Sequence, residues 1–107
     1  MILKEETESF LRLIIIKKLE LDMATTAIKF YADWCGPCKV YAKTWDKVSS
    51  ELSDVIFENV NIEKDTTGMA AKYKVTNIPH TVVIKDGITD AKTGRLSAEE
   101  LKNLIIN

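Results

Sequence analysis

Two cysteines separated by two residues offer the clearest chemistry in this sequence. Cys35 and Cys38 are the only cysteines of the chain, and they belong to the string Trp34-Cys35-Gly36-Pro37-Cys38. At this spacing, a mixed disulfide formed on one sulfur can be attacked by the other, which is the chemistry of dithiol–disulfide exchange. Gly36 and Pro37 set the turn, and Pro37 suits the first turn of a helix, where its missing N–H leaves no hydrogen bond unmade. A helix N-terminus beside the first cysteine favours its thiolate.

Two other interpretations of the cysteine pair are weaker. A disulfide that closes so short a loop constrains the unfolded chain little, so a structural staple explains the pair poorly. A zinc site normally has four ligands, and this chain offers two thiols and one histidine, His80. His80 could also pair with a cysteine in catalysis, or lie on a strand beside the site and tune its response to pH. We predict a redox-active cysteine pair and no metal.

Length and composition indicate one globular domain. The 107 residues are 46% apolar and 29% charged, and domains cluster near about 100–150 residues. We therefore predict a single domain over residues 1–107, and we expect a monomer. The formal net charge of -1 argues against binding to nucleic acid or to an anionic membrane surface. The longest apolar run, residues 13–16, is far shorter than the roughly 20 residues of a transmembrane helix.

The N-terminal residues favour a cytoplasmic location. Glu5, Glu6 and Glu8 stand where a signal peptide would carry basic residues, so we expect no secretion signal. Stable structural disulfides are rare in the reducing cytoplasm. A cytoplasmic location therefore also favours a redox-active pair.

The elements that must position the cysteines alternate between strands and helices. Residues 1–3 could form a short strand, and residues 6–19 carry an imperfect helical stripe. Beyond them, the pattern predicts strands over 26–31, 55–60, 81–84 and 88–91, and helices over 37–52, 67–73 and after Ser97. We expect the strand over 55–60 to be a buried central strand. The predicted buried face of the helix over 37–52 consists of Val40, Tyr41, Trp45, Val48 and Leu52.

Local signals mark a hairpin and the start of the last helix. Asp86-Gly87 is typical of a two-residue hairpin turn. Ser97 and Glu100 have the spacing of a capping box, and the helix after them would turn Leu101, Leu104 and Ile105 inward. An alternating α/β start followed by a hairpin and a closing helix predicts a mixed sheet with helices on both faces.

The chain resembles the thioredoxin family along nearly all of its length. The string Phe-Tyr-Ala-Asp-Trp-Cys-Gly-Pro-Cys-Lys over residues 30–39 is similar to the active-site stretch of that family. Farther along, Ile78-Pro79 is similar to the family's approach to a cis-proline, and Asp86-Gly87 matches its hairpin. The resemblance implies a thioredoxin-like α/β fold, with a mixed central β-sheet flanked by helices on both faces.

The resemblance also implies a role for each residue of the site. Cys35 would be the exposed attacking nucleophile, and Cys38 the more buried resolving thiol. The peptide bond before Pro79 would be cis, and the backbone of Ile78-Pro79 would pair with an extended substrate segment. Trp34 would shield the site and contact the substrate.

The implied activity is that of a protein-disulfide reductase. Its partners would be disulfide-containing protein substrates and a thioredoxin reductase or a similar electron donor. No cofactor is implied, since nothing in the chain resembles a phosphate-binding glycine loop.

Lys29 is the departure from the family that matters most. The family has a buried Asp at this position, which assists proton removal from the resolving thiol, and the usual basic partner of that Asp is replaced by Asn59. A buried ammonium about 6 Å away would stabilise a thiolate by about 3 kcal/mol at an effective dielectric constant of about 20, and would make the disulfide more oxidising. A neutral Lys29 could instead accept the proton itself. If the aliphatic part of the Lys29 side chain extends so that its ammonium reaches water, Lys29 would have little effect on the cysteines.

Two alternative functions stay open. The first is a binding or scaffold subunit that keeps the fold within a larger assembly, which the loss of the Asp and its partner favours. The intact cysteine pair argues against it, because a scaffold has no need of two vicinal thiols. The second is a more oxidising disulfide oxidant or isomerase, which the redox potential would distinguish.

Overall fold

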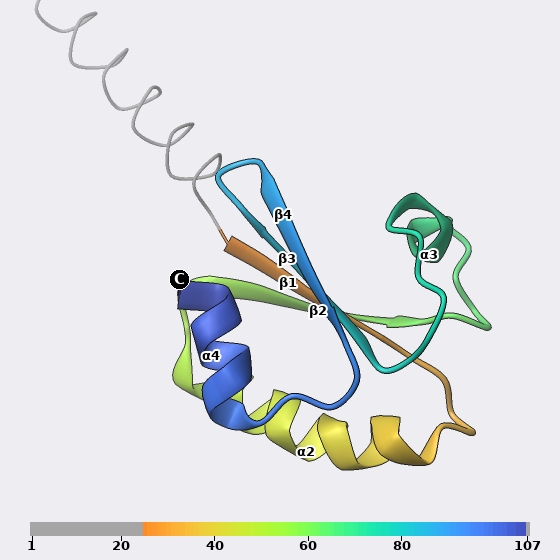
Figure 1. The fold of residues 1–107 in the computed structure, drawn as a ribbon, viewed down its shortest axis with the longest axis horizontal. Coiled ribbons are helices and arrows are strands. Elements are labelled where there is room, and N and C mark those ends of the chain that lie inside the picture. The colour runs from red at the N-terminus through yellow and green to blue at the C-terminus, as the bar shows by residue number, and fades with distance from the viewer. Residues whose placement is uncertain (1–24, 107) are drawn as a thin grey trace, which may run out of the picture.

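The computed structural model describes residues 25–106. In chain order its elements are β1 (Thr25–Tyr31), α2 (Gly36–Glu51), β2 (Val55–Asn61), α3 (Met69–Lys72), β3 (His80–Lys85), β4 (Ile88–Thr93) and α4 (Ala98–Ile106), shown in Figure 1. The strand predicted over 1–3 and the helix predicted over 6–19 lie outside the described residues. A single domain over residues 1–107 therefore stays a prediction.

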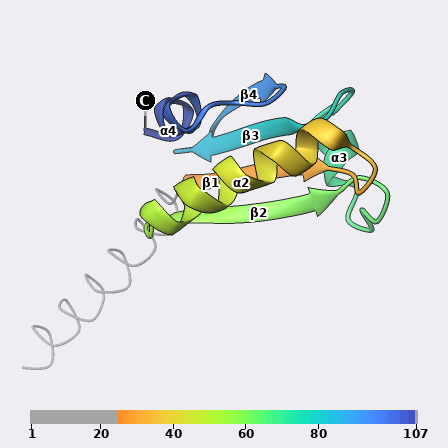
Figure 2. The same cartoon turned by 90° about the horizontal axis from the view of Figure 1, so that it is seen from below.

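The four described strands form one mixed sheet in the order β2-β1-β3-β4. β1 runs parallel to β2 and antiparallel to β3, and β3 and β4 form an antiparallel hairpin (Figure 2). Helices α2 and α4 pack on one face of the sheet and α3 on the other (Figure 1). The predicted fold class is confirmed.

Alternation along the strands divides the core into two layers. Ala27 of β1 faces α2 and α4, where it belongs to a buried cluster of Tyr41, Trp45, Val48, Val83, Leu96, Leu101 and Ile105. Ile28 and Phe30 face the other way and pack with Val82 and with partly buried residues of α3. Lys29 is therefore on the same face of β1 as Ala27, directly above α2.

The hairpin and the last helix begin as the sequence predicts. Asp86 and Gly87 have positive φ angles of 53° and 78°, which the favoured two-residue hairpin turn requires. At the start of α4, the N–H of Glu100 donates to Ser97 Oγ at 3.1 Å, and the N–H of Ser97 donates to Glu100 Oε1 at 3.2 Å. The capping box is confirmed.

One detail of the predicted core is wrong, and another is tested only in part. The buried residues of α2 are Cys38, Tyr41, Trp45 and Val48. Val40 is exposed, because it lies one residue off this stripe and points about 100° away from it. The strand Val55–Asn61 is at one edge of the sheet that residues 25–106 form. Its central position stays a prediction, because the strand predicted over 1–3 lies outside the described residues. Ile56 on Val55–Asn61 is exposed, so this strand is less buried than predicted.

Candidate active site

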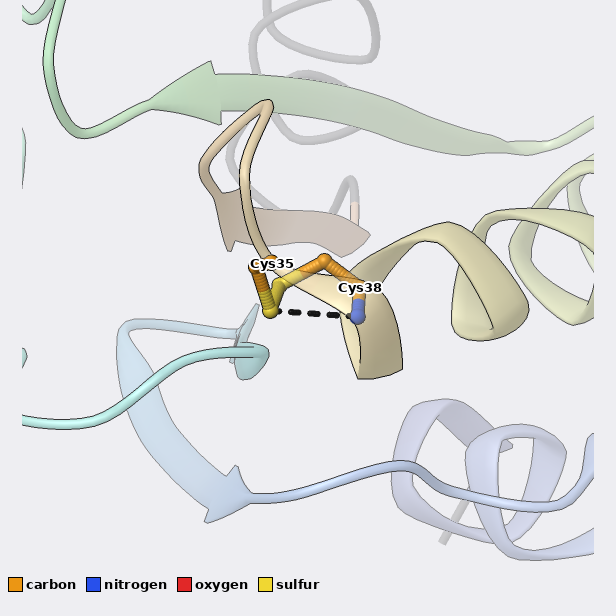
Figure 3. The surroundings of a disulfide bond; sticks show 2 residues. All are labelled: Cys35 and Cys38. Carbon is orange, nitrogen blue, oxygen red and sulfur yellow. Dashed lines mark hydrogen bonds between the residues drawn. A yellow bond between two sulfur atoms is a disulfide. The ribbon is translucent and has the colours of Figure 1, made fainter.

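The two cysteines form a disulfide at the N-terminus of α2 (Figure 3). Cys35 is the N-cap residue, with an extended backbone at φ -83° and ψ 107°, and a proline follows in the first turn. The N–H of Cys38 donates to Cys35 Sγ at 3.2 Å, drawn as the dashed line in Figure 3. The sulfur of Cys35 thus takes the place of the oxygen of an ordinary N-cap side chain. After reduction, the same N–H and the positive end of the helix would favour negative charge on this sulfur.

Both cysteines are buried, which corrects one expectation. The exposed fractions are 4% for Cys35 and 3% for Cys38, so Cys35 is not the exposed member of the pair in the disulfide form. The two side chains form a buried cluster with Ala32, against which Ile62 and Ile78 pack. Tyr31 also packs against this cluster, so these three residues contribute to the burial of the cysteine pair.

The peptide bond between Ile78 and Pro79 is cis, as the resemblance implies. Pro79 is fully buried, and its carbonyl accepts a hydrogen bond from the N–H of Gly94 at 2.8 Å. Within residues 25–106, no backbone hydrogen bond to another described residue uses the N–H or carbonyl of Ile78. The N–H and carbonyl of Ile78 could therefore form hydrogen bonds with an extended segment, whereas the carbonyl of Pro79 is already paired with Gly94.

Trp34 lies at the surface beside the disulfide. It is 67% exposed and borders a groove of about 310 Å³. The other residues of the groove are Ile62, Val75, Thr76, Asn77 and Ile78. Gly36 and Pro37 are exposed at the first turn of α2, so the structure leaves this edge of the site open.

Lys29 lies beneath the site and is 6% exposed. In the sheet it stands between Asn59 of β2 and Thr81 of β3. Burial lowers the pKa of the Lys29 ammonium, and the nearby Asp46 carboxylate opposes this effect by raising it. This burial favours the two interpretations in which Lys29 acts on the site over the one in which open water surrounds its ammonium.

His80 is on the opposite face of the sheet from Lys29. It pairs with Phe30 in the register, and its Nδ1 lies 2.8 Å from Thr93 Oγ1. Burial lowers the pKa of His80. Its ring nitrogen pairs with Thr93 rather than with a cysteine, so a Cys–His catalytic pairing stays a prediction.

Two neighbours of the site are not apparent from the sequence pattern. Asp46 comes eight residues after Cys38 on α2, which places both on one side of the helix. This spacing relates Asp46 to Cys38 and not to Lys29, which lies on β1. The hydrogen bond of 2.7 Å between the Tyr41 and Thr81 hydroxyls joins residues 40 apart in sequence and left no signal.

Within residues 25–106, no cluster of three or more His, Cys, Asp or Glu side chains could hold a metal ion. In the same part of the chain, no helix is long and apolar enough to span a bilayer.

Comparison with known proteins decides the family. A model of the thioredoxin family matches residues 5–107. The chain belongs to the thioredoxin family. Members of this family are thiol-disulfide oxidoreductases, and Cys35 and Cys38 supply the dithiol that this chemistry needs.

Curated relatives and solved structures agree with this assignment. The chain is 31% identical over 97 residues to a thioredoxin of Mycoplasmoides gallisepticum, an alignment that covers 85% of this chain and 96% of that protein. It is 43% identical over 60 residues to a thioredoxin of Mycoplasma pneumoniae, covering 56% of this chain and 58% of that protein. The X-ray structure of Fasciola hepatica thioredoxin superposes with a TM-score of 0.72 at 31% identity, covering 86% of this chain and 88% of that chain.

Proposed function

We propose that this thioredoxin-family protein is a protein-disulfide reductase, in which Cys35 attacks the substrate and Cys38 resolves the intermediate. The observation that carries these roles is the hydrogen bond from the N–H of Cys38 to Cys35 Sγ at the start of α2. A thiolate on Cys35 gains from this donor and from the helix N-terminus. Cys38 lies in the first turn of α2, and its sulfur is within bonding distance of the sulfur of Cys35.

The proposed reaction has two exchange steps. The Cys35 thiolate attacks one sulfur of the substrate disulfide, forms a mixed disulfide and releases the other substrate sulfur as a thiolate, which takes up a proton. Cys38 then loses its proton and attacks Cys35 Sγ, which breaks the mixed disulfide and releases the second substrate thiol. The two cysteines are oxidised to the Cys35–Cys38 disulfide, and the substrate disulfide is reduced to two thiols.

We propose that the substrate is an extended protein segment lying along the groove beside Trp34. The exposed indole of Trp34 offers apolar contact area, and the backbone groups of Ile78 are free of other described residues. Ile78 also packs against the cysteine cluster. A segment paired with the Ile78 backbone would therefore hold its disulfide close to Cys35, with Pro79 supporting this loop from within the core.

The reductase role implies an electron donor. We propose that a thioredoxin reductase or a similar donor re-reduces the Cys35–Cys38 disulfide, so that the protein serves as an electron carrier. We also propose that it acts as a monomer in the cytoplasm, where thiols are kept reduced, without nucleic acid or a membrane as partner.

Burial of Lys29 favours a second candidate of the same chemistry, a more oxidising disulfide oxidant or isomerase. A cation near the thiolates stabilises the reduced form of the protein and raises the potential of the couple. The measured reduction potential separates this candidate from the reductase.

Trapping of mixed disulfides tests the two cysteine roles. Reduced Cys38→Ser, mixed with a protein disulfide such as that of insulin, should accumulate a covalent complex on Cys35, because the resolving thiol is absent. Reduced Cys35→Ser should accumulate much less, and Cys35→Ser/Cys38→Ser none. A complex that forms with Cys35→Ser but not with Cys38→Ser would reverse the roles. The absence of a complex with either variant would contradict the proposed function.

A further inference from the structure

A cavity of about 340 Å³ approaches the resolving cysteine from the side of the sheet that faces α2. Cys38, Lys29 and Asp46 all border it. The groove beside Trp34 is a separate hollow with none of these three residues. A substrate bound in the groove beside Trp34 would therefore not fill the cavity that Cys38, Lys29 and Asp46 border.

Lys29 is the buried charged residue of this cavity. Thr81 is the other buried polar residue in the described part of the chain, and it is neutral. The Nζ of Lys29 lies 5.4 Å from the ring centroid of Tyr31 and 5.6 Å from that of Trp45. Two aromatic faces at these distances attract a cation and hold it in place.

The other groups around the cavity leave this charge largely uncancelled. From β2, the neighbour of Lys29 is the neutral Asn59, and from β3 it is Thr81. From α2, the exposed Asp46 and Lys39 border the cavity with opposite charges. Exposed Asp33, which precedes α2, borders it too, but its carboxylate is 3.8 Å from the ammonium of Lys64. Solvent screens these exposed groups more than it screens Lys29.

We propose that Lys29 is a positioning residue for the resolving step, whose ammonium, held between the rings of Tyr31 and Trp45, stabilises the thiolate of Cys38. This inference rests on the proposed function. It adds a reason why Cys38 loses its proton in the second exchange step. When a mixed disulfide occupies Cys35, the Cys38 thiol releases its proton to solvent. The Cys38 thiolate, which borders the same cavity as Lys29, attacks Cys35 Sγ, and the substrate sulfur leaves as a thiolate that takes up a proton.

A thiol titration tests this proposal without any substrate. In a Cys35→Ser background, Cys38 is the sole thiol, and the NMR shift of its 13Cβ reports its protonation. Replacing Lys29 with Met, which is of similar length, should raise the pKa of Cys38 by about one unit, which is about a tenfold loss of thiolate at a given pH below that pKa. Lys29→Arg should restore the original titration, since a cation returns to the cavity.

Two further variants separate charge from structure. Lys43→Met removes an exposed lysine of α2 that does not border the cavity, and should leave the titration of Cys38 unchanged. Asp46→Asn removes an exposed carboxylate and should lower the pKa of Cys38, because the ammonium is then less neutralised. A shift in opposite directions for Lys29→Met and Asp46→Asn is not what loosened packing produces.

Equal Cys38 pKa values in the parent, Lys29→Met and Asp46→Asn would overturn the proposal, as would equal shifts in Lys29→Met and Lys43→Met. The failure of the proposed function is a different result. In that case no mixed disulfide is trapped by Cys38→Ser, whatever the titration of Cys38 shows.

Discussion

The hydroxyl groups of Tyr41 and Thr81 lie 2.7 Å apart and form a buried hydrogen bond between α2 and β3. Thr81 is the neighbour of Lys29 in the sheet, so this bond fixes the helix that carries the cysteines against the strand beside Lys29. A buried hydroxyl that loses its partner keeps its desolvation penalty. We therefore expect Tyr41→Phe to lower the free energy of unfolding at pH 7 by about 1–3 kcal/mol in urea denaturation.

The same pair gives stability an alkaline pH dependence. Burial raises the pKa of Tyr41 to about 12, above the value near 10 of a tyrosine in an unfolded chain. The folded state then binds a proton that the unfolded state has lost, so stability decreases as pH rises from about 10 to about 12. The stability difference between the parent and Tyr41→Phe should shrink over this window, measured by urea denaturation at each pH. A constant difference would contradict the buried hydroxyl.

The reduction potential should respond to Lys29. If its ammonium stabilises the reduced form, Lys29→Met makes the couple more reducing, by about 30 mV for each tenfold loss of stabilisation. Equilibration with glutathione redox buffers, followed by alkylation of free thiols, measures this potential. Lys43→Met should match the parent protein. A potential of Lys29→Met equal to or above that of the parent would show that the cation does not favour the dithiol.

Trp34 should matter for protein substrates and not for small disulfides. An exposed tryptophan beside the groove offers contact area that only a large partner uses, and such residues are typical binding hot spots worth about 2 kcal/mol or more. We expect Trp34→Ala to lower kcat/KM for insulin by about tenfold or more, mainly through KM. Its rate with a small aromatic disulfide should stay near that of the parent.

Ile88→Ala provides the matched control for Trp34, because Ile88 is equally exposed but lies at the β3–β4 hairpin. It should leave both rates unchanged. Equal losses of rate with insulin and with the small disulfide in Trp34→Ala would contradict a substrate-contact role.

The capping box of α4 should contribute measurably to stability. Ser97→Ala leaves the N–H of Glu100 without its side-chain acceptor, and loss of an N-cap oxygen costs about 1 kcal/mol. Ser50→Ala, at an exposed position inside α2 whose hydroxyl bonds the carbonyl of Lys47, should have little effect in the same denaturation experiment. Equal stabilities of Ser97→Ala and Ser50→Ala would contradict the cap.

Features set by short sequence segments were predictable. The Asp86-Gly87 turn and the Ser97–Glu100 capping box depend on neighbours in the chain, and both form as predicted. The helix that begins at the cysteines follows from the proline at its start. The cis bond before Pro79 followed from family resemblance alone, because the local sequence favours trans by base rate.

Features set by long-range packing were harder to predict. An apolar segment such as Val55–Asn61 predicts a buried strand, whereas Ile56 on it is exposed in the folded protein. Burial of Cys35 depends on Ile62 and Ile78, which are distant in sequence. The position of Asp46 near Lys29 likewise required α2 to be docked on β1.

Reduction of insulin disulfides by the dithiothreitol-coupled assay, at pH 6 to 9, tests the central claim most directly. The parent protein should accelerate the reduction well above dithiothreitol alone, and both Cys35→Ser and Cys38→Ser should lose most of this acceleration. No acceleration by the parent protein, or full acceleration by Cys35→Ser, would contradict a reductase that works through the Cys35–Cys38 pair.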